Sequence, residues 1–439
     1  MRSRTSTVGF SVLAWGLCTF VSLSLSALVS GAPALQVGNT KLTDASLPDL
    51  QQDLFGGIPY AEPPVGSLRF LHRFSSSIQE SLTSLPPNLV LPVVRAPNIA
   101  ASLRGVNSSS LLPVIVWVHD GGFSQGSASM YNGSVIAVQS IGWGTPVVYA
   151  NPNYRLGSLA FPQDEEAETL GETNFGNKVV IAALIWIKQN IDTFDGRDED
   201  KITIFREIWL GGKPTISQSP GPEDIWKTFA SFVPECEGAS CNNTFDCLRS
   251  ASSDTILNAA TSTLTSVQER TPFSPVIDSL DGIIPDLPSK LSANSQFEHI
   301  PFIAGTNLDE GTTFVPTAIN STAQFQQAVF SAASPSLVSS EEQASVINTA
   351  LQMYPDDPAS GSPFGTGNET FGLSSQLKRA TAILCDVSFT SPRRSISQKA
   401  SEQGVKVFAY LFTVPQAANL PAFVGVEHGS DKAYVGGAP

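Results

Sequence analysis

Short apolar runs that end at glycine or at a polar turn recur along the middle of the chain. The runs LPVIVWVHDGGF (112–123), TPVVYANPNYR (145–155) and KITIF (201–205) are rich in β-branched residues, which predicts strands. The run NKVVIAALIWIKQN (177–190) is too long for a strand and apolar nearly all round, which predicts a buried helix. This order requires crossover connections, so it predicts an α/β fold with a mostly parallel central sheet flanked by helices.

Two more β-rich runs follow in the second half of the chain. HIPFIAGTN (299–307) precedes an acidic turn, and VKVFAYLFTV (405–414) leads towards a histidine near the C-terminus. The Ser- and Ala-rich stretch 331–350 between them predicts surface helices and loops. The chain has 439 residues, of which 41% are hydrophobic and 15% charged, so it can bury a large core. We expect residues 32–439 to form a single domain.

The N-terminus has the pattern of a secretory signal peptide. Arg2 and Arg4 precede an apolar stretch that ends at Val29 and is followed by small residues up to Ala32. This pattern predicts a signal peptide over residues 1–31 and a secreted, extracellular protein. The apolar stretch is longer than usual, so a retained membrane anchor is the alternative, and no other segment is apolar enough to span a bilayer. Glycosylation sequons, which fit a secreted protein, begin at Asn107, Asn132, Asn242, Asn320 and Asn368.

Charge and cysteine content narrow the possible partners. Lys and Arg number 25 against 39 Asp and Glu, a net charge of −14, so we expect no nucleic-acid partner. Cys236, Cys241 and Cys247 lie close together, and an oxidising compartment favours one short-loop disulfide there, although the spacing leaves the partners open. The sequence has neither an H-E-x-x-H motif nor a dinucleotide-binding fingerprint, so no metal or cofactor is implied.

A glycine turn follows the first predicted strand. His119 and Asp120 precede Gly121 and Gly122, and glycine at these positions can turn backbone amides towards a site. Such amides stabilise the oxyanion that develops in acyl transfer. The alternative is a plain glycine turn after a strand.

Two acidic residues and one histidine form the second group of candidates. Asp309 and Glu310 follow a predicted strand, at the sheet edge where α/β proteins often carry functional residues; an acidic surface turn is the alternative. The chain has only four histidines, and His428 is the only one that follows Glu310. In α/β-hydrolases the chain order is nucleophile, acid, base, so an acid at Glu310 leaves His428 as the base.

A series of short motifs also runs in order along the chain: FGGIPYAEPPVGSLRF (55–70), WVHDGGFSQGSAS (117–129), NYRLG (153–157), KITIF (201–205), DCLRS (246–250) and GTNLDEGT (305–312). This series resembles the successive signatures of type B carboxylesterases and lipases, the cholinesterase-like branch of the α/β-hydrolases, and above all their secreted fungal members. The resemblance implies an α/β-hydrolase fold, a small-molecule or lipid ester as substrate, and a Ser-Glu-His triad.

The resemblance also assigns roles to individual residues. It implies that Glu310 is the triad acid, that His428 is the triad base, and that Gly121 and Gly122 belong to the oxyanion hole. It further implies a disulfide between Cys236 and Cys247, with Cys241 left as an extra thiol.

The resemblance breaks at the nucleophile. After KITIF the family has Gly-Glu-Ser-Ala-Gly, but residues 206–210 here are Arg-Glu-Ile-Trp-Leu, so Ile208 stands where the serine belongs. Isoleucine has no nucleophilic atom, and its β-branched side chain disfavours the strained turn that exposes the serine. The resemblance to the family begins again near Ile216, which indicates that the turn and its helix have been lost. We therefore expect the chain as written to be inactive.

Other departures accompany this loss. Ser124 completes a formal G-x-S-x-G, but it follows the wrong strand and no long helix begins directly after it, so we do not assign it as the nucleophile. Asp120 replaces the first glycine of the oxyanion motif. The chain ends at Pro439, soon after His428, where the family continues. These departures predict an incomplete α/β-hydrolase domain.

Two hypotheses of different classes follow. The first is a secreted carboxylic-ester hydrolase whose written sequence is damaged, for instance by misplaced exon boundaries, because the loss after Phe205 is abrupt. The second is a non-catalytic relative that uses the scaffold for binding, as cholinesterase-like adhesion proteins do. Scattered changes such as Asp120 favour the second hypothesis.

Overall fold

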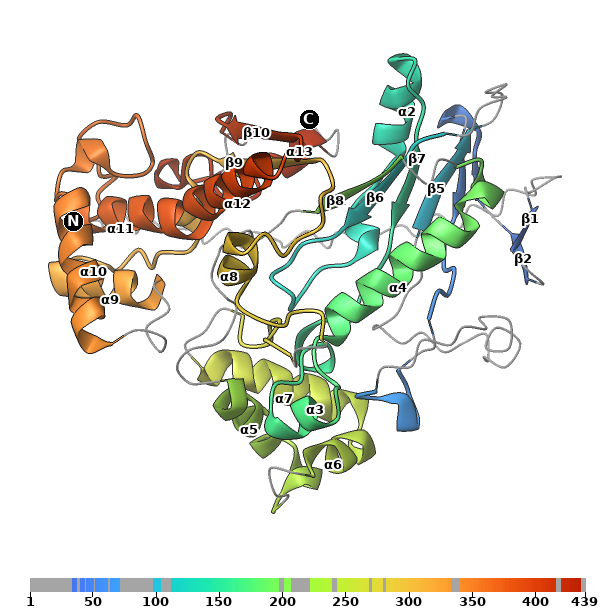
Figure 1. The fold of residues 1–439 in the computed structure, drawn as a ribbon, viewed down its shortest axis with the longest axis horizontal. Helices are drawn as coiled ribbons and strands as arrows, with labels where there is room; N and C mark the ends of the chain where they lie inside the picture. Colours follow the sequence, from blue (N-terminus) through green and yellow to red (C-terminus); the bar gives the residue numbers. More distant parts are fainter. Residues whose placement is uncertain are drawn as a thin grey trace, which may run out of the picture. The chain divides into compact units, whose positions relative to one another are not determined.

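The structure is a computed structural model that describes most of the chain between Ala34 and Val435 (Figure 1). The described residues are 34–37, 40–43, 45–50, 52–61, 64–71, 98–103, 112–196, 201–206, 222–238, 243–267, 271–278, 282–332, 339–415 and 420–435. The predictions on the signal peptide (1–31), Ile208, Cys241 and the sequons at Asn107 and Asn242 lie outside these residues.

A six-stranded sheet forms the first half of the described fold, in the order β3-β4-β5-β7-β6-β8. The predicted strands β6, β7 and β8 run parallel, with Val114 of β6 in register with Val148 and with Ile202. On the other side of β7, three strands add antiparallel pairings that the sequence pattern did not predict. The strands are β3 (Ala45–Leu47), β4 (Gln52–Phe55), β5 (Asn98–Leu103), β6 (Val114–Val118), β7 (Val148–Asn151) and β8 (Ile202–Arg206).

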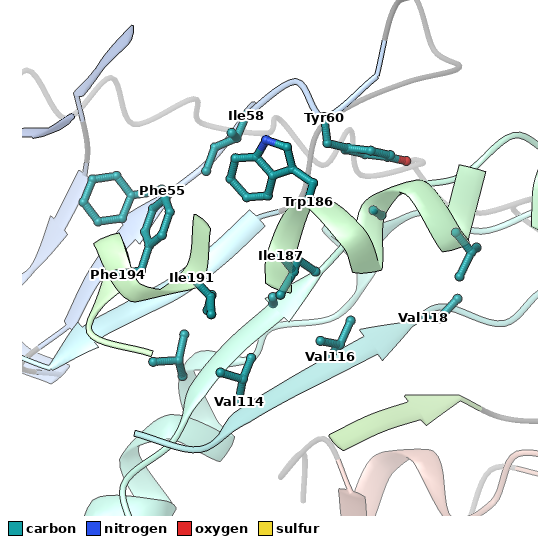
Figure 2. Packing of buried hydrophobic residues seen from close by; sticks show 14 of the residues in the cluster. Phe55, Ile58, Tyr60, Val114, Val116, Val118, Trp186, Ile187, Ile191 and Phe194 are labelled. Carbon is teal, nitrogen blue, oxygen red and sulfur yellow. The ribbon is translucent and has the colours of Figure 1, made fainter. Parts of the chain in front are cut away.

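The predicted long helix is α4 (Phe175–Asn190), and it covers one face of this sheet (Figure 1). Figure 2 shows Trp186 and Ile187 of α4 in the same apolar cluster as Val114, Val116 and Val118 of β6. Side chains two residues apart on a strand share a face, which explains why the three valines meet one helix. The cluster contains further buried residues of the N-terminal strands and of the turn after α4, among them Phe55, Ile58, Tyr60, Ile191 and Phe194.

The helix α4 is not buried all round, contrary to the prediction. Ile181 and Ile185 are 43% and 52% exposed. They lie four residues apart and so share one face of the helix. The sheet buries only the stripe that contains Val179, Val180, Ala183 and Ile187. The apolar run is therefore an unusually hydrophobic surface helix with one buried side.

A second, two-stranded parallel sheet carries the acidic turn. It pairs β9 (Phe302–Asn307) with β10 (Val407–Phe412), in register from Phe302 with Val407 to Asn307 with Phe412. The helix α12 (Ser391–Glu402) lies beside both strands. Both strands were predicted, and so was the surface helix α10 (Ser340–Met353), which begins with a capping box between Ser339 and Glu342.

A separate apolar cluster involves three helices that lie between β8 and β9 in chain order, namely α5, α6 and α7. Trp226 of α5 and Phe245 of α6 are fully buried in this cluster. A disulfide joins Cys236 and Cys247 beside this cluster, and this is the pairing that the resemblance implies. The remaining elements are β1 (Ala34–Val37), β2 (Thr40–Thr43), α2 (Ser134–Gly142), α3 (Glu165–Thr169), α5 (Pro222–Ser231), α6 (Thr244–Ser250), α7 (Ser253–Ser266), α8 (Pro288–Ala293), α9 (Thr322–Ala332), α11 (Ser375–Cys385), a π-helical turn (Asp386–Thr390) and α13 (Lys432–Val435).

Two carboxylates hold the start of α6. Asp164 caps α3 by accepting a hydrogen bond from the Ala167 amide at 2.8 Å, and it also accepts one from Thr244 Oγ1 at 3.2 Å. Glu166 accepts hydrogen bonds from the Thr244 amide at 2.6 Å and from its hydroxyl at 2.7 Å. Burial raises the pKa of Asp164 to about 6, and the neighbouring Glu166 acts in the same direction.

No helix in the described part of the chain is both long and apolar enough to cross a membrane.

Candidate active site

The structure brings the predicted acid and base into contact. His428 Nδ1 lies 2.6 Å from Glu310 Oε2, although the two residues are 118 positions apart. A carboxylate only accepts hydrogen bonds, so Nδ1 is the donor. Glu310 is buried, and its other oxygen accepts hydrogen bonds from the amide of Asn307 at 2.6 Å and from the Asn307 side chain at 3.2 Å. Both carboxylate oxygens are therefore held in place at the end of β9.

Asp309, the other member of the acidic pair, faces away from the histidine and anchors the loop that carries it. Its Oδ2 accepts a hydrogen bond from the Val426 amide at 2.9 Å, and the Asp309 amide donates to the Val426 carbonyl at 2.9 Å. Its Oδ1 accepts hydrogen bonds from Ser362 Oγ and from the Phe364 amide, both at 2.8 Å. The two neighbouring acids thus have different partners: Glu310 contacts the imidazole, and Asp309 holds the backbone two residues before it.

Two phenylalanine rings flank the imidazole of His428. The ring centre of Phe314 lies 5.0 Å from that of His428, and the ring centre of Phe389 lies 5.2 Å from it. Phe314 follows the turn that carries Glu310, and Phe389 projects from the π-helical turn after α11. These contacts restrict rotation of the imidazole about its χ2 angle, so the ring keeps Nδ1 towards Glu310.

The glycine turn after β6 has a backbone that only glycine adopts easily. Gly121 and Gly122 have φ angles of +118° and +60°. A Cβ atom on Gly121 would lie 1.9 Å from the carbonyl oxygen of Gln125, so no other residue fits there. Phe123 also has a positive φ of 62°, and its carbonyl accepts a hydrogen bond of 2.7 Å from the Gly157 amide. The turn is therefore fixed to the rest of the fold, as a preorganised group of donors requires.

An ion pair joins the glycine turn to the histidine loop. Lys432 lies four residues after His428, and Asp120 lies directly before Gly121. The Lys432 ammonium group donates a hydrogen bond to Asp120 Oδ2. Tyr131 donates its hydroxyl to the other oxygen of the Asp120 carboxylate. In the sequence Asp120 stands out only as a replaced glycine, and no pattern marks Lys432. The two charges are 312 residues apart, and no local pattern connects them.

The expected position of the nucleophile follows β8, at the same edge of the sheet. In the parallel register Val118 of β6 pairs with Arg206 of β8, so both strands end together. The described strand β8 thus ends level with the start of the glycine turn, and Ile208 lies outside the described residues. The Oγ atom of Ser124 is buried, and it has no hydrogen-bond partner within the described ranges. The turn around Ser124 is followed by a single 3-10 turn (Ala128–Met130), and not by a long helix.

The remaining predicted residues are placed as follows. His119 is buried, stacks on Tyr154 with ring centres 4.5 Å apart, and contacts the Asp120 carbonyl through Nδ1 at 2.9 Å, so it has a packing role. His299 lies on the surface. The sequon asparagines that the structure describes are all exposed: Asn132, Asn320 and Asn368.

Comparisons with known proteins show which family the chain resembles along its length. The chain matches the model of the Carboxylesterase family over residues 89–215 and 206–439. It is 31% identical to Lipase 2 of Geotrichum candidum over 493 aligned positions, which cover 93% of this chain and 84% of that protein. Secreted lipase 1 of Botryotinia fuckeliana is 27% identical, with 92% of this chain and 80% of that protein covered. The crystal structure of Aspergillus niger EstA has a similar fold, with a TM-score of 0.71 at 22% identity, covering 92% of this chain and 82% of that one.

Proposed function

The chain belongs to the carboxylesterase family and has the α/β-hydrolase fold, and from this premise we propose that it carries the acid and base of a Ser-Glu-His ester hydrolase, Glu310 and His428, without the serine. The contact of 2.6 Å between His428 Nδ1 and Glu310 Oε2 is the observation that carries this proposal. In the form written here the protein is inactive.

The acid and base have the geometry that acyl transfer needs. Because Nδ1 donates to Glu310, the imidazole is held in the tautomer in which Nε2 takes the proton from a nucleophile. The buried carboxylate also stabilises the imidazolium that forms in this step. Amides of the turn at Gly121 and Gly122 are the donors for the oxyanion. A carboxylic ester, either a small molecule or a lipid, is the substrate that this chemistry serves.

The absence of the serine is supported by where the match to the family is divided. The match falls into two segments that overlap at residues 206–215, the stretch that holds Ile208. The alignment with Lipase 2 spans 493 positions, more than the 439 residues of the chain, so that lipase has segments without a counterpart here. An isoleucine at the position of the nucleophile cannot form an acyl-enzyme.

The compartment follows from the same proposal. A signal peptide over residues 1–31 precedes one hydrolase domain over 32–439, and the product is secreted and glycosylated. Three relatives are named secreted lipases, which supports an extracellular location. Exposure of three sequon asparagines fits glycan attachment, and the proposed sites are Asn107, Asn132, Asn242, Asn320 and Asn368.

The decisive experiment compares the transcript with the protein. The transcript is sequenced across the codons for residues 202–222, and the protein as written and the protein that the transcript encodes are both purified. Each is treated with a fluorophosphonate probe and assayed with p-nitrophenyl butyrate. We expect a Gly-x-Ser-x-Gly segment in the transcript, labelling of its serine, and no labelling of the chain as written.

Variants of the transcript-encoded protein test the acid and the base. His428→Asn and Glu310→Gln should abolish or strongly reduce labelling, whereas His299→Asn, on the surface, should leave it unchanged. Labelling of the chain as written would overturn the absence of a nucleophile, and Ser124→Ala would then test the one serine with a formal motif. A transcript identical to the written sequence, with no labelling, would overturn the hydrolase function in favour of a binding role.

A further inference from the structure

We propose that Asp120 is a positioning residue of the active site, because its ion pair with Lys432 holds the glycine turn and the His428 loop together. We call this contact the Asp120–Lys432 bridge. The proposal rests on the proposed function, since it concerns the distance between the oxyanion donors and the general base. It concerns the glycine position at which this chain departs from the family motif.

The β6 side of the bridge is rigid. Asp120 is the second residue after β6, and its side chain is only 18% exposed. The Tyr131 hydroxyl donates to the same carboxylate, and the Tyr131 ring packs on Trp117 of β6 with ring centres 5.1 Å apart. The carboxylate is therefore held at a fixed place directly before Gly121. A movement of Asp120 would displace the backbone amides that follow it.

The other side of the bridge is close to the general base. Lys432 begins α13, and a Cβ atom on Gly429 would lie 2.8 Å from Lys432 Nζ, so the ammonium group packs against the residue that follows His428. Gly429 has a φ of +83°, and with no side chain it leaves room for the lysine. Val435, on the same short helix, packs, as Tyr131 does, against the cluster that contains Trp117 and Tyr149.

The bridge connects the histidine loop to the β6 side, whereas the hydrogen bonds of Glu310, Asp309 and Asp431 connect the loop to β9 and β10. Glu310 and Asp309 hold the loop to the end of β9. Asp431 accepts hydrogen bonds from Asn307 Nδ2 at 3.4 Å and from the Tyr410 hydroxyl at 2.7 Å, so it holds the loop to β9 and β10. These anchors position His428 against its acid. Lys432 contacts the β6 side instead, where the oxyanion donors lie.

This difference gives the bridge a specific consequence for catalysis. Proton transfer and oxyanion stabilisation act on the same carbonyl group, so the base and the amide donors must keep a fixed separation. Partial burial of both charges strengthens their attraction relative to a surface pair. Loss of one charge leaves the other partly buried without its counterion, which favours opening of the contact. The general base and the oxyanion donors would then move independently.

Hydrogen–deuterium exchange tests the bridge in the full chain without any need for hydrolysis. Peptides that cover residues 119–131 and 425–435 are followed in wild type, Asp120→Asn, Lys432→Gln and the charge-reversal double variant Asp120→Lys with Lys432→Asp. Each single variant should raise exchange in the opposite segment by about five- to tenfold, and charge reversal should return it to within about twofold of wild type. Glu223→Gln, which removes a pair with Lys227 on the surface, is the matched control and should change neither segment.

The two single variants approach the bridge from different elements, so failure of one to fold still leaves the other as a test. An effect confined to the mutated segment, or a double variant that exchanges as fast as the single variants, would overturn the bridge. A packing effect of either side chain alone would not be restored by reversing both charges. The outcome is independent of the nucleophile, because the exchange measurement does not depend on activity.

Discussion

Asp309 is the buried residue whose loss should destabilise the active-site region most. Its carboxylate accepts hydrogen bonds from Ser362 Oγ, the Phe364 amide and the Val426 amide, at 2.8, 2.8 and 2.9 Å. Ser362 is fully buried and Val426 is nearly so. In Asp309→Ala three donors lose their acceptor, two of them in buried bonds, at about 1–3 kcal/mol each. Because partial relaxation and water entry reduce the total, we expect a loss of about 3–6 kcal/mol in the free energy of unfolding.

Urea denaturation followed by tryptophan fluorescence measures this loss. Asp309→Asn keeps the shape but replaces one acceptor oxygen with a donor, so about 2 kcal/mol is expected. Asp357→Ala is the matched control, because Asp357 also accepts two hydrogen bonds, from Ala359 and Ser360, but is exposed to solvent. The control should cost about 1 kcal/mol or less. If Asp309→Ala were no more destabilising than Asp357→Ala, the assignment of Asp309 as the anchor of the histidine loop would be wrong.

Two other predictions concern pH and backbone conformation. Because the pKa of Asp164 is raised to about 6, the folded protein binds this proton more tightly than the unfolded chain. The contribution of Asp164 to the free energy of unfolding should therefore fall by about 2 kcal/mol between pH 4 and pH 6. Urea denaturation of wild type and Asp164→Asn at both pH values measures this fall, which the variant should lack. Gly121→Ala should lower the free energy of unfolding by at least about 3 kcal/mol, since its Cβ would meet Gln125. Gly144→Ala is the control: its φ is +72° but its surroundings are open, so the loss should be about 1 kcal/mol. Equal Tm values for the two variants would contradict this prediction.

The sequence predicts the fold well where one apolar run corresponds to one element. The strands β6, β7, β9 and β10 lie within runs that their β-branched pattern identifies, and β8 and the helix α4 match their runs to within two residues at each end. The antiparallel strands β3, β4 and β5 were not predicted. They have three to six residues each, and β4 and β5 are separated by residues 56–97, so no local turn signal links them. Their pairing depends on burial against the rest of the sheet, which a periodicity does not reveal.

The active site shows the same division between local and distant information. Chain order alone predicted His428 as the base that belongs to an acid at Glu310, and the two side chains are in contact in the structure. Which of the two adjacent acids faces the imidazole depends on the backbone of the turn after β9, where Asp309 has a φ of −120° and Glu310 begins a 3-10 turn. The hydrogen bonds of Asp309 to Ser362 and Val426 span 53 and 117 residues and have no sequence signature.

The Asp120–Lys432 bridge also bears on the two explanations for the unusual sequence. A misplaced exon boundary replaces a contiguous stretch of text, and the change after Phe205, which ends near Ile216, has this form. Such an error does not explain why Lys432, which is 312 residues away along the chain, lies in contact with Asp120. A carboxylate at this partly buried position would be costly without a counterion, and Lys432 supplies the opposite charge in the folded protein. We therefore expect Asp120 to be present in the transcript, whatever residues that transcript encodes after Phe205.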